Sequence, residues 1–161
     1  MKFIGRVKQL TQIKKELLTD GMRMVLIYGR RRVGKSELVK QAIKESGVKS
    51  FYYECKQVTE ASNVHSICEI ISEVQKLPKL GYSSIEEVLN YVFKLAKEEN
   101  IVFVLDEYPY LRENVKGLDS ILQSYESAIF YPLLSNEDKV RIYSVFGGIP
   151  YFNRLIDDKK S

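Results

Sequence analysis

The sequence has few of the residues from which metal centres and disulfide frameworks are built. Its 161 residues include two isolated cysteines, Cys55 and Cys68, and a single histidine, His65. None of the three lies at the spacing of metal ligands, and two distant cysteines do not form a disulfide framework. We therefore expect two buried thiols and an imidazole on the surface of a helix.

Long apolar runs are also missing. No stretch reaches the roughly 18 apolar residues of a membrane-spanning helix, and the first residues, MKFIGRVKQL, lack the apolar core of a signal peptide. We expect a cytoplasmic protein without membrane contact. Hydrophobic residues nevertheless make up 45% of the chain, enough for a domain with a real core. The net charge of +4 is modest, and it does not by itself indicate nucleic-acid binding.

The most informative stretch is MVLIYGRRRVGKS, residues 24–36. An apolar strand over Met24–Tyr28 leads into Gly29–Ser36, which matches G-x-x-x-x-G-K-[ST] without a substitution. Glycines let the backbone curl so that successive N–H groups face an anion, and the following helix adds the positive end of its dipole. The spacing predicts a polyphosphate-binding loop. In it, Lys35 reaches the β- and γ-phosphates and the Ser36 hydroxyl binds Mg²⁺. The residues predicted to contact the nucleotide here are Gly29, Arg30, Arg31, Arg32, Val33, Gly34, Lys35, Ser36 and Glu37.

Periodic patterns predict the elements around this loop. Apolar residues recur at helical spacing over 7–18, 38–47, 62–76 and 85–96, and strand-like runs occupy 50–54 and 101–105. Ser84, followed three residues later by Glu87, is typical of a helix N-cap.

An acidic pair follows the most apolar strand. Ile101–Leu105 ends in Asp106 and Glu107, and ligands of open α/β sheets bind at the carboxyl ends of strands. We therefore expect the pair beside the phosphate loop, with Asp106 positioning Mg²⁺ through water and Glu107 polarising an attacking water as general base. A simple turn after a buried strand is the alternative, because Asp is common in turns.

Four segments together carry a family resemblance: FIGR at 3–6, YGRRRVGKS at 28–36, LDEYPYL at 105–111 and YSVFGGIPY at 143–151. With them the chain resembles the prokaryotic, largely archaeal ATPase family related to AAA+ and STAND NTPases. The resemblance implies ATP or ADP with Mg²⁺ as ligands. It assigns Lys35 to phosphate, Ser36 and Asp106 to the metal and Glu107 to water. It also places Ile4 and Gly5 near the adenine, although simple packing against a helix is an equal alternative for the Phe3–Ile4 pair.

The resemblance also implies an α/β fold: a three-layer P-loop core of the ASCE type with a short, mostly parallel sheet. We expect this core over residues 1–130 and a remnant of the family's helical lid over 131–161. Residues 135–161 are accordingly predicted as small helices. Arg112, Arg141 and Arg154 are candidates for a finger or sensor arginine, although a solvated surface position is the favoured interpretation of each.

One part of the family pattern is missing. Family members continue after the DE-x-P-Y-L segment with a helix and another strand, which lies between the first and third strands in the order 5-1-4-3-2. Residues 111–136 contain no strand-like run. Unpaired buried backbone groups cost about 1–3 kcal/mol each, so the gap must be resolved. Three outcomes are possible: the first and third strands become neighbours in the order 1-3-2, another segment or chain fills the gap, or the fold is loosened. We favour the first.

Three function classes follow. The first is a slow, Mg²⁺-dependent ATPase whose turnover acts on a protein or nucleic-acid effector. The second is a module that binds nucleotide without productive hydrolysis, and the third is a fragment that forms a homodimer through exposed sheet edges. A GTPase is less expected because no N-K-x-D motif occurs, and a small-molecule kinase has no visible acceptor residues.

Overall fold

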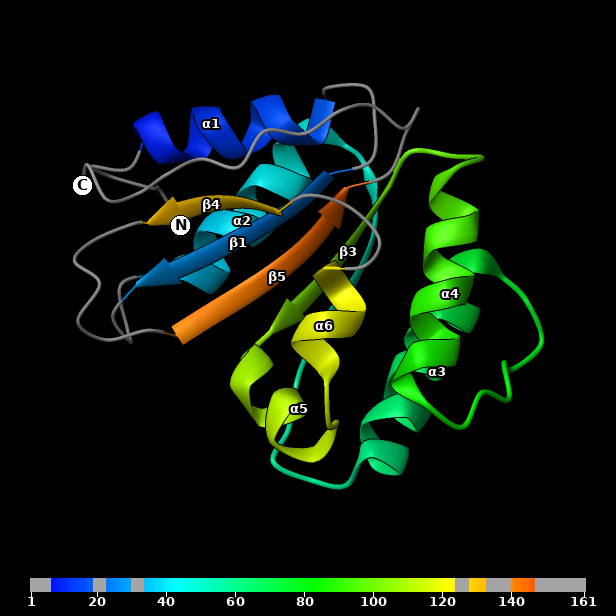
Figure 1. Ribbon diagram of the computed structural model, residues 1–161. Coiled ribbons are helices and arrows are strands. Elements are labelled where there is room, and N and C mark those ends of the chain that lie inside the picture. Colours follow the sequence, from blue (N-terminus) through cyan, green and yellow to red (C-terminus); the bar gives the residue numbers. More distant parts are fainter. Residues whose placement is uncertain (1–6, 19–22, 30–33, 124–127, 133–139, 147–161) are drawn as a thin grey trace.

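The computed structural model describes residues 7–18, 23–29, 34–123, 128–132 and 140–146 (Figure 1). The helices are α1 Val7–Leu18, α2 Lys35–Ser46, α3 Glu60–Gln75, α4 Ile85–Ala96, α5 Tyr108–Asn114 and α6 Leu118–Gln123. The strands are β1 Arg23–Gly29, β2 Lys49–Glu54, β3 Ile101–Asp106, β4 Ala128–Pro132 and β5 Val140–Phe146. Among these described residues, no helix has both the length and the apolar composition that crossing a bilayer requires.

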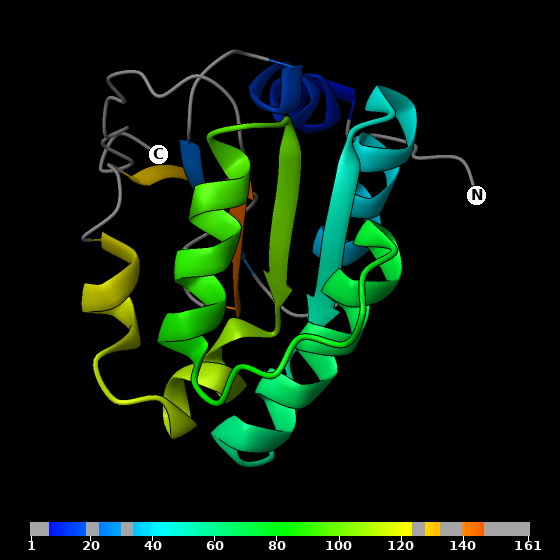
Figure 2. The same ribbon diagram turned by 90° about the vertical axis from the view of Figure 1, so that its right-hand side faces the viewer.

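The strands form one mixed sheet in the order β2-β3-β5-β1-β4. The pairs β2–β3 and β1–β4 are parallel, and Figure 2 shows the arrows of β2 and β3 pointing the same way. Strand β5 runs antiparallel to both β1 and β3, and Tyr143 lies opposite Leu26 on one side and Leu105 on the other. The α/β class predicted from the sequence is therefore confirmed, with one antiparallel strand inside the sheet.

The predicted strand order 1-3-2 is wrong, because β5 separates β1 from β3. Every residue of β1 pairs with β5, and four residues of β3, Val102–Leu105, pair with its other edge. The backbone groups that a missing strand would have left unpaired thus find partners within the chain. Of the three outcomes for the gap, the second is the observed one: another segment fills it.

The prediction of helices after residue 135 is wrong for Val140–Phe146, which forms β5. The sequence VRIYSVF is rich in β-branched and aromatic residues, which fit a pleated sheet, and pairing on both edges outweighs its helical spacing. Ala128–Pro132 is a second strand that the sequence analysis missed, at the edge of the sheet where proline is tolerated. The sheet therefore continues past residue 130. Residues 147–161 of the expected lid lie outside the described residues.

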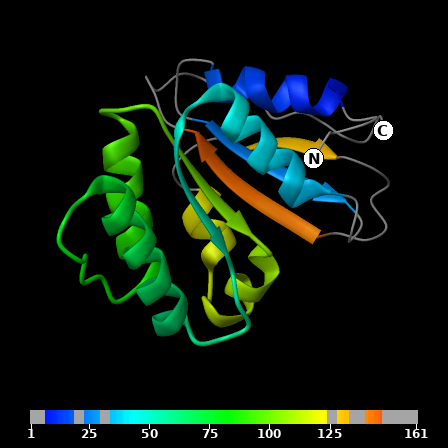
Figure 3. The same cartoon turned by 180° about the vertical axis from the view of Figure 1, so that it is seen from behind.

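Helices cover both faces of β3, which is buried along its whole length. On one face, α1 and α2 pack against Val102 and Val104 of β3. On the other face, α3, α4, α5 and α6 pack against Phe103 and Leu105. Figure 3 shows α2 lying across the sheet with α1 beside it. Because both cores hold β3, its carboxyl end at Asp106 occupies a fixed position relative to the start of α2.

Replacing Leu38 by alanine tests the core beneath α2. Leu38 has no exposed surface and belongs to the cluster between α1, α2 and β3. We expect Leu38→Ala to lower the free energy of unfolding by about 2–5 kcal/mol through the cavity it leaves. Urea unfolding followed by circular dichroism measures this loss. Lys44→Ala, at an exposed position of the same helix, is the control, and a loss equal to that of this control would contradict the packing.

Candidate functional site

The phosphate-loop motif spans the junction between β1 and α2. Strand β1 ends at Gly29 and α2 begins at Lys35. Gly34 precedes the helix with φ 83° and ψ 23°, a left-handed conformation that glycine adopts without a Cβ penalty. The first N–H groups of a helix have no intrahelical acceptor, so the start of α2 offers donors and a positive dipole end. Lys35 is buried there, with 5% of its surface exposed, and Glu37 is exposed.

Other residues predicted for this site cannot be placed. The structure does not describe the loop positions Arg30, Arg31, Arg32 and Val33, nor the adenine candidates Ile4 and Gly5. Their contacts to a nucleotide stay predictions.

The phosphate-loop helix and the acidic pair meet directly. The Ser36 hydroxyl, in the first turn of α2, donates a hydrogen bond of 2.5 Å to Oδ2 of Asp106, seventy positions later at the end of β3. Asp106 is 2% exposed. The expected position of Asp106 beside the phosphate-loop helix is therefore the observed one, whereas its role toward a metal stays a prediction.

Asp106 accepts two further hydrogen bonds. The hydroxyl of Tyr52, on the adjacent strand β2, also donates to Oδ2, and the backbone N–H of Glu107 donates to Oδ1 at 2.8 Å. Hydrogen bonds to an ionised carboxylate are stronger than those between neutral groups. Burial, and then the hydrogen bond to Asp106, raises the pKa of Tyr52, so the phenol stays a neutral donor. The carboxylate is thus fixed by one donor from each of α2 and β2 and by one from its own neighbour.

Tyr52 is the residue of this site that the sequence analysis missed. The register pairs Glu54 with Asp106 and Tyr52 with Val104, so Tyr52 shares the sheet face of Asp106, one row earlier. A phenol is long enough to reach across that row. The sequence feature that points to Tyr52 is an aromatic residue two positions before the end of β2. It indicates a contact with Asp106 only once the β2–β3 register is known.

Glu107 has an unusual backbone conformation. Its φ of 54° and ψ of 40° lie in the left-handed region, which costs a non-glycine residue of the order of 1–2 kcal/mol. Such conformations persist where the surroundings hold them, often at functional sites. Here the Glu107 N–H donates a hydrogen bond to Asp106, which holds the backbone in this conformation. Pro109 follows in the first turn of α5. The Glu107 residue is half-buried, whereas Asp106 is buried.

Both cysteines are free, buried thiols, as predicted. The Cys55 N–H donates to the backbone oxygen of Asp106 at 2.7 Å and so extends the β2–β3 pairing by one residue. Burial raises the pKa of the Cys55 thiol, and the carboxylates of Asp106 and Glu107 raise it further. A neutral thiol at this position supports the strand end without adding a reactive nucleophile.

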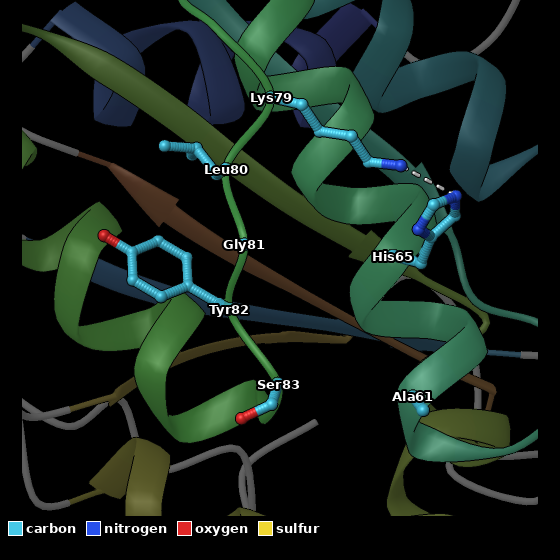
Figure 4. Close-up of a pocket in the computed structure, with 7 residues that line it drawn as sticks. All are labelled: Ala61, His65, Lys79, Leu80, Gly81, Tyr82 and Ser83. Atoms are coloured by element: carbon cyan, nitrogen blue, oxygen red, sulfur yellow. Dashed lines mark hydrogen bonds between the residues drawn. The ribbon is translucent and has the colours of Figure 1, made fainter.

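A separate pocket of about 360 Å³ lies between α3 and the segment that leads to α4 (Figure 4). His65 and Lys79 approach each other at its rim at 3.2 Å, and His65 also lies 3.1 Å from Glu69. The exposed imidazole on α3 confirms the surface position expected for it. The pocket belongs to the helical layer on the opposite face of the sheet from α2, and it contains none of the phosphate-loop or acidic residues.

The oxygen atoms near Asp106 suit a hard cation. Ser36 contributes a hydroxyl and Asp106 a carboxylate, and Mg²⁺ is usually bound by one or two carboxylates together with substrate phosphates. In the described part of the chain, no group of three or more His, Cys, Asp or Glu side chains is arranged for a metal. A hydroxyl and a carboxylate are donors that fit a magnesium ion to which a phosphate chain would also bind.

Comparison with known proteins agrees with this geometry. Residues 3–135 match the family described as "ATPase domain predominantly from Archaea", whose members are P-loop NTPases. The chain belongs to this family. The resemblance stated from the sequence is confirmed.

One curated relative is an uncharacterized protein of Methanocaldococcus jannaschii. It is 24% identical over 140 residues, which cover 87% of this chain and 29% of the relative. The chain thus spans less than a third of that protein. No solved structure matches the chain.

Alanine substitutions at two glycines distinguish the cost of backbone strain from an effect on nucleotide binding. Gly34 and Gly47 flank α2 at φ +83° and +69°, and a Cβ at either would meet no atom within 4 Å. We expect Gly34→Ala and Gly47→Ala each to lower the free energy of unfolding by about 1–2 kcal/mol through conformational strain. Only Gly34→Ala should also weaken nucleotide binding, measured by calorimetry. Equal nucleotide affinities in the two variants would contradict the assignment of the phosphate loop.

Proposed function

We propose that this chain binds ATP with Mg²⁺ and hydrolyses it slowly. The observation that carries the proposal is the hydrogen bond between Ser36 and Asp106, which brings the phosphate-loop helix against the strand-end carboxylate. Membership of an archaeal ATPase family supports the same activity. The relative from Methanocaldococcus jannaschii is much longer than the region it shares with this chain, so the proposal covers nucleotide binding and hydrolysis and names no effector.

In this proposal the start of α2 holds the phosphates. Lys35 and the N–H groups of the first helical turn neutralise and orient the β- and γ-phosphates, and Gly29 and Gly34 let the backbone approach them. Ser36 and Asp106 would hold a magnesium ion, Asp106 through its water shell. When bound, Mg²⁺ would neutralise charge on the β- and γ-phosphate oxygens.

Glu107 is the proposed general base. Its backbone N–H is fixed to Oδ1 of Asp106, so the position where its side chain begins is set by the same carboxylate that faces Ser36. The residue is half-buried, so part of its surface is accessible to water. A base in this position orients the water and accepts its proton in the transition state.

The sheet supports an ASCE-type P-loop core in which β5 replaces the expected fourth strand. Strand β5 lies between β1 and β3 but runs antiparallel to them, so its first residue, Val140, is opposite Gly29. Among the described strands, the one between β1 and β3 therefore has its carboxyl end away from the phosphate loop, whereas the family's sensor follows the carboxyl end of a parallel strand at this place. Arg141 is opposite Tyr28, the residue before Gly29, in the β1–β5 register. Arg112 lies on α5, 3.6 Å from Asp119, and Arg154 is outside the described residues.

A nucleotide-binding module without productive turnover is the second candidate. The observation that favours it is the antiparallel direction of β5, which removes the usual position of a group that contacts the γ-phosphate. Positioning and electrostatic stabilisation supply most of the rate in phosphoryl transfer, so such a loss would slow hydrolysis by orders of magnitude. Homodimerisation through the edge strand β2 stays a separate proposal.

Removing the Lys35 ammonium tests nucleotide binding. We expect Lys35→Ala to weaken ATP affinity at least about tenfold, because a charge-assisted contact to phosphate is lost. Titration calorimetry with Mg·ATP measures the change. Lys44→Ala, on the exposed side of the same helix, should retain the affinity of the unmodified chain. Unchanged affinity in Lys35→Ala would refute both the ATPase and the binding module.

Removing the Glu107 carboxylate separates the two candidates. We expect Glu107→Gln to retain Mg·ATP binding but to lose about 10²–10⁴-fold in hydrolysis rate, the usual contribution of a general base. Phosphate release from radiolabelled ATP measures the rate. Glu113→Gln, at an exposed position of α5, is the matched control. If the unmodified chain binds ATP but releases no phosphate above buffer, the binding module is the correct assignment.

A further inference from the structure

Tyr52 contacts the proposed magnesium ligand but belongs to neither sequence motif. We infer that Tyr52 is a positioning residue for the metal site, which holds the Asp106 carboxylate in the orientation that meets the ion. The inference rests on the proposed function. The observation that carries it is the convergence of the Tyr52 and Ser36 hydroxyls on the same oxygen, Oδ2 of Asp106.

The phenol ring of Tyr52 is itself held in place. The Nζ atom of Lys40, on α2, lies 5.0 Å from the ring centroid, within the range of a cation–π contact. The ring also packs against the cluster formed by α1, α2 and β3. Tyr52 therefore links the phosphate-loop helix, strand β2 and the end of β3, and its hydroxyl has a defined direction.

The three donors to Asp106 have different tasks. The Ser36 hydroxyl can offer an oxygen lone pair to a bound ion while its proton stays on Oδ2 of Asp106, because a hydroxyl has one donor proton and two lone pairs. Tyr52 donates to Oδ2 and the Glu107 N–H donates to Oδ1, so each carboxylate oxygen has a donor that is not itself a proposed ligand of the ion. A buried carboxylate without such donors is costly and free to rotate away. Groups that orient metal ligands in this way typically change metal affinity 10–100-fold when removed.

The neighbouring Tyr53 is a matched control. It lies on the same strand, and its hydroxyl donates to Oδ1 of the buried Asn63 on α3. Its ring belongs to the cluster on the other face of the sheet, away from Asp106. Tyr52→Phe and Tyr53→Phe thus remove equivalent hydroxyls and keep both rings, but only the first change touches the proposed metal site.

The experiment measures how strongly the metal and the nucleotide depend on each other. ATP affinity is determined by titration calorimetry in EDTA and in saturating Mg²⁺. The ratio of the dissociation constant in EDTA to the dissociation constant in Mg²⁺ is then compared between variants. We expect Tyr52→Phe to reduce this ratio about tenfold with little change in EDTA, whereas Tyr53→Phe leaves the ratio unchanged. Thermal unfolding of each variant verifies the fold.

A double-mutant cycle tests whether Tyr52 changes the ratio of dissociation constants through Asp106 rather than through the stability of the fold. If Tyr52 acts through Asp106, then Tyr52→Phe has no further effect on the ratio in an Asp106→Asn background. An unchanged ratio in Tyr52→Phe, equal decreases in both tyrosine variants, or a further decrease in the Asp106→Asn background would each overturn the inference. If the unmodified chain binds no ATP in either condition, the proposed function fails as well. If it binds ATP but one of these three outcomes is found, only the role of Tyr52 fails.

Discussion

A carboxylate buried at the end of a strand must be surrounded by hydrogen-bond donors, and this requirement organises the structure around Asp106. The residue is 2% exposed and receives hydrogen bonds from Ser36, Tyr52 and the Glu107 backbone. These donors come from α2, from β2 and from the turn into α5. Their convergence depends on β3 being packed on both faces, because each core fixes one set of neighbours. In the proposed function, the same carboxylate would offer oxygen atoms to a cation.

Strand β5 shows how the chain completes its sheet. In the expected family order a parallel strand separates β1 from β3, and here a later segment occupies that place in the opposite direction. The backbone pairing is satisfied, so the two strands that carry the motifs stay one strand apart. The direction of β5, however, changes which of its residues lie near the phosphate loop. The two strands that carry the motifs thus keep their separation, while the strand between them runs opposite to the family's expected direction.

The sequence predicted those parts of the site that depend on local rules. The loop motif, the helix start and the strand-end carboxylates needed only short patterns, and the meeting of Ser36 with Asp106 followed from the parallel arrangement. The N-cap at Ser84, whose hydroxyl accepts from the Glu87 N–H, was readable for the same reason. Strand β5 was missed because its apolar residues fit a helical spacing as well as a strand, and only its two neighbours decide between them. Tyr52 was missed because its role depends on the register between β2 and β3.

The central claim is that Ser36 and Asp106 face a magnesium ion bound to the phosphates of ATP. A crystal structure of this chain with Mg²⁺ and a non-hydrolysable ATP analogue tests it most directly. The account predicts the ion at about 2.0–2.1 Å from the Ser36 hydroxyl oxygen, with Asp106 reaching it through water and the phosphates at the start of α2. A nucleotide bound elsewhere, for example in the pocket beside His65, or an ion remote from Ser36 would contradict it.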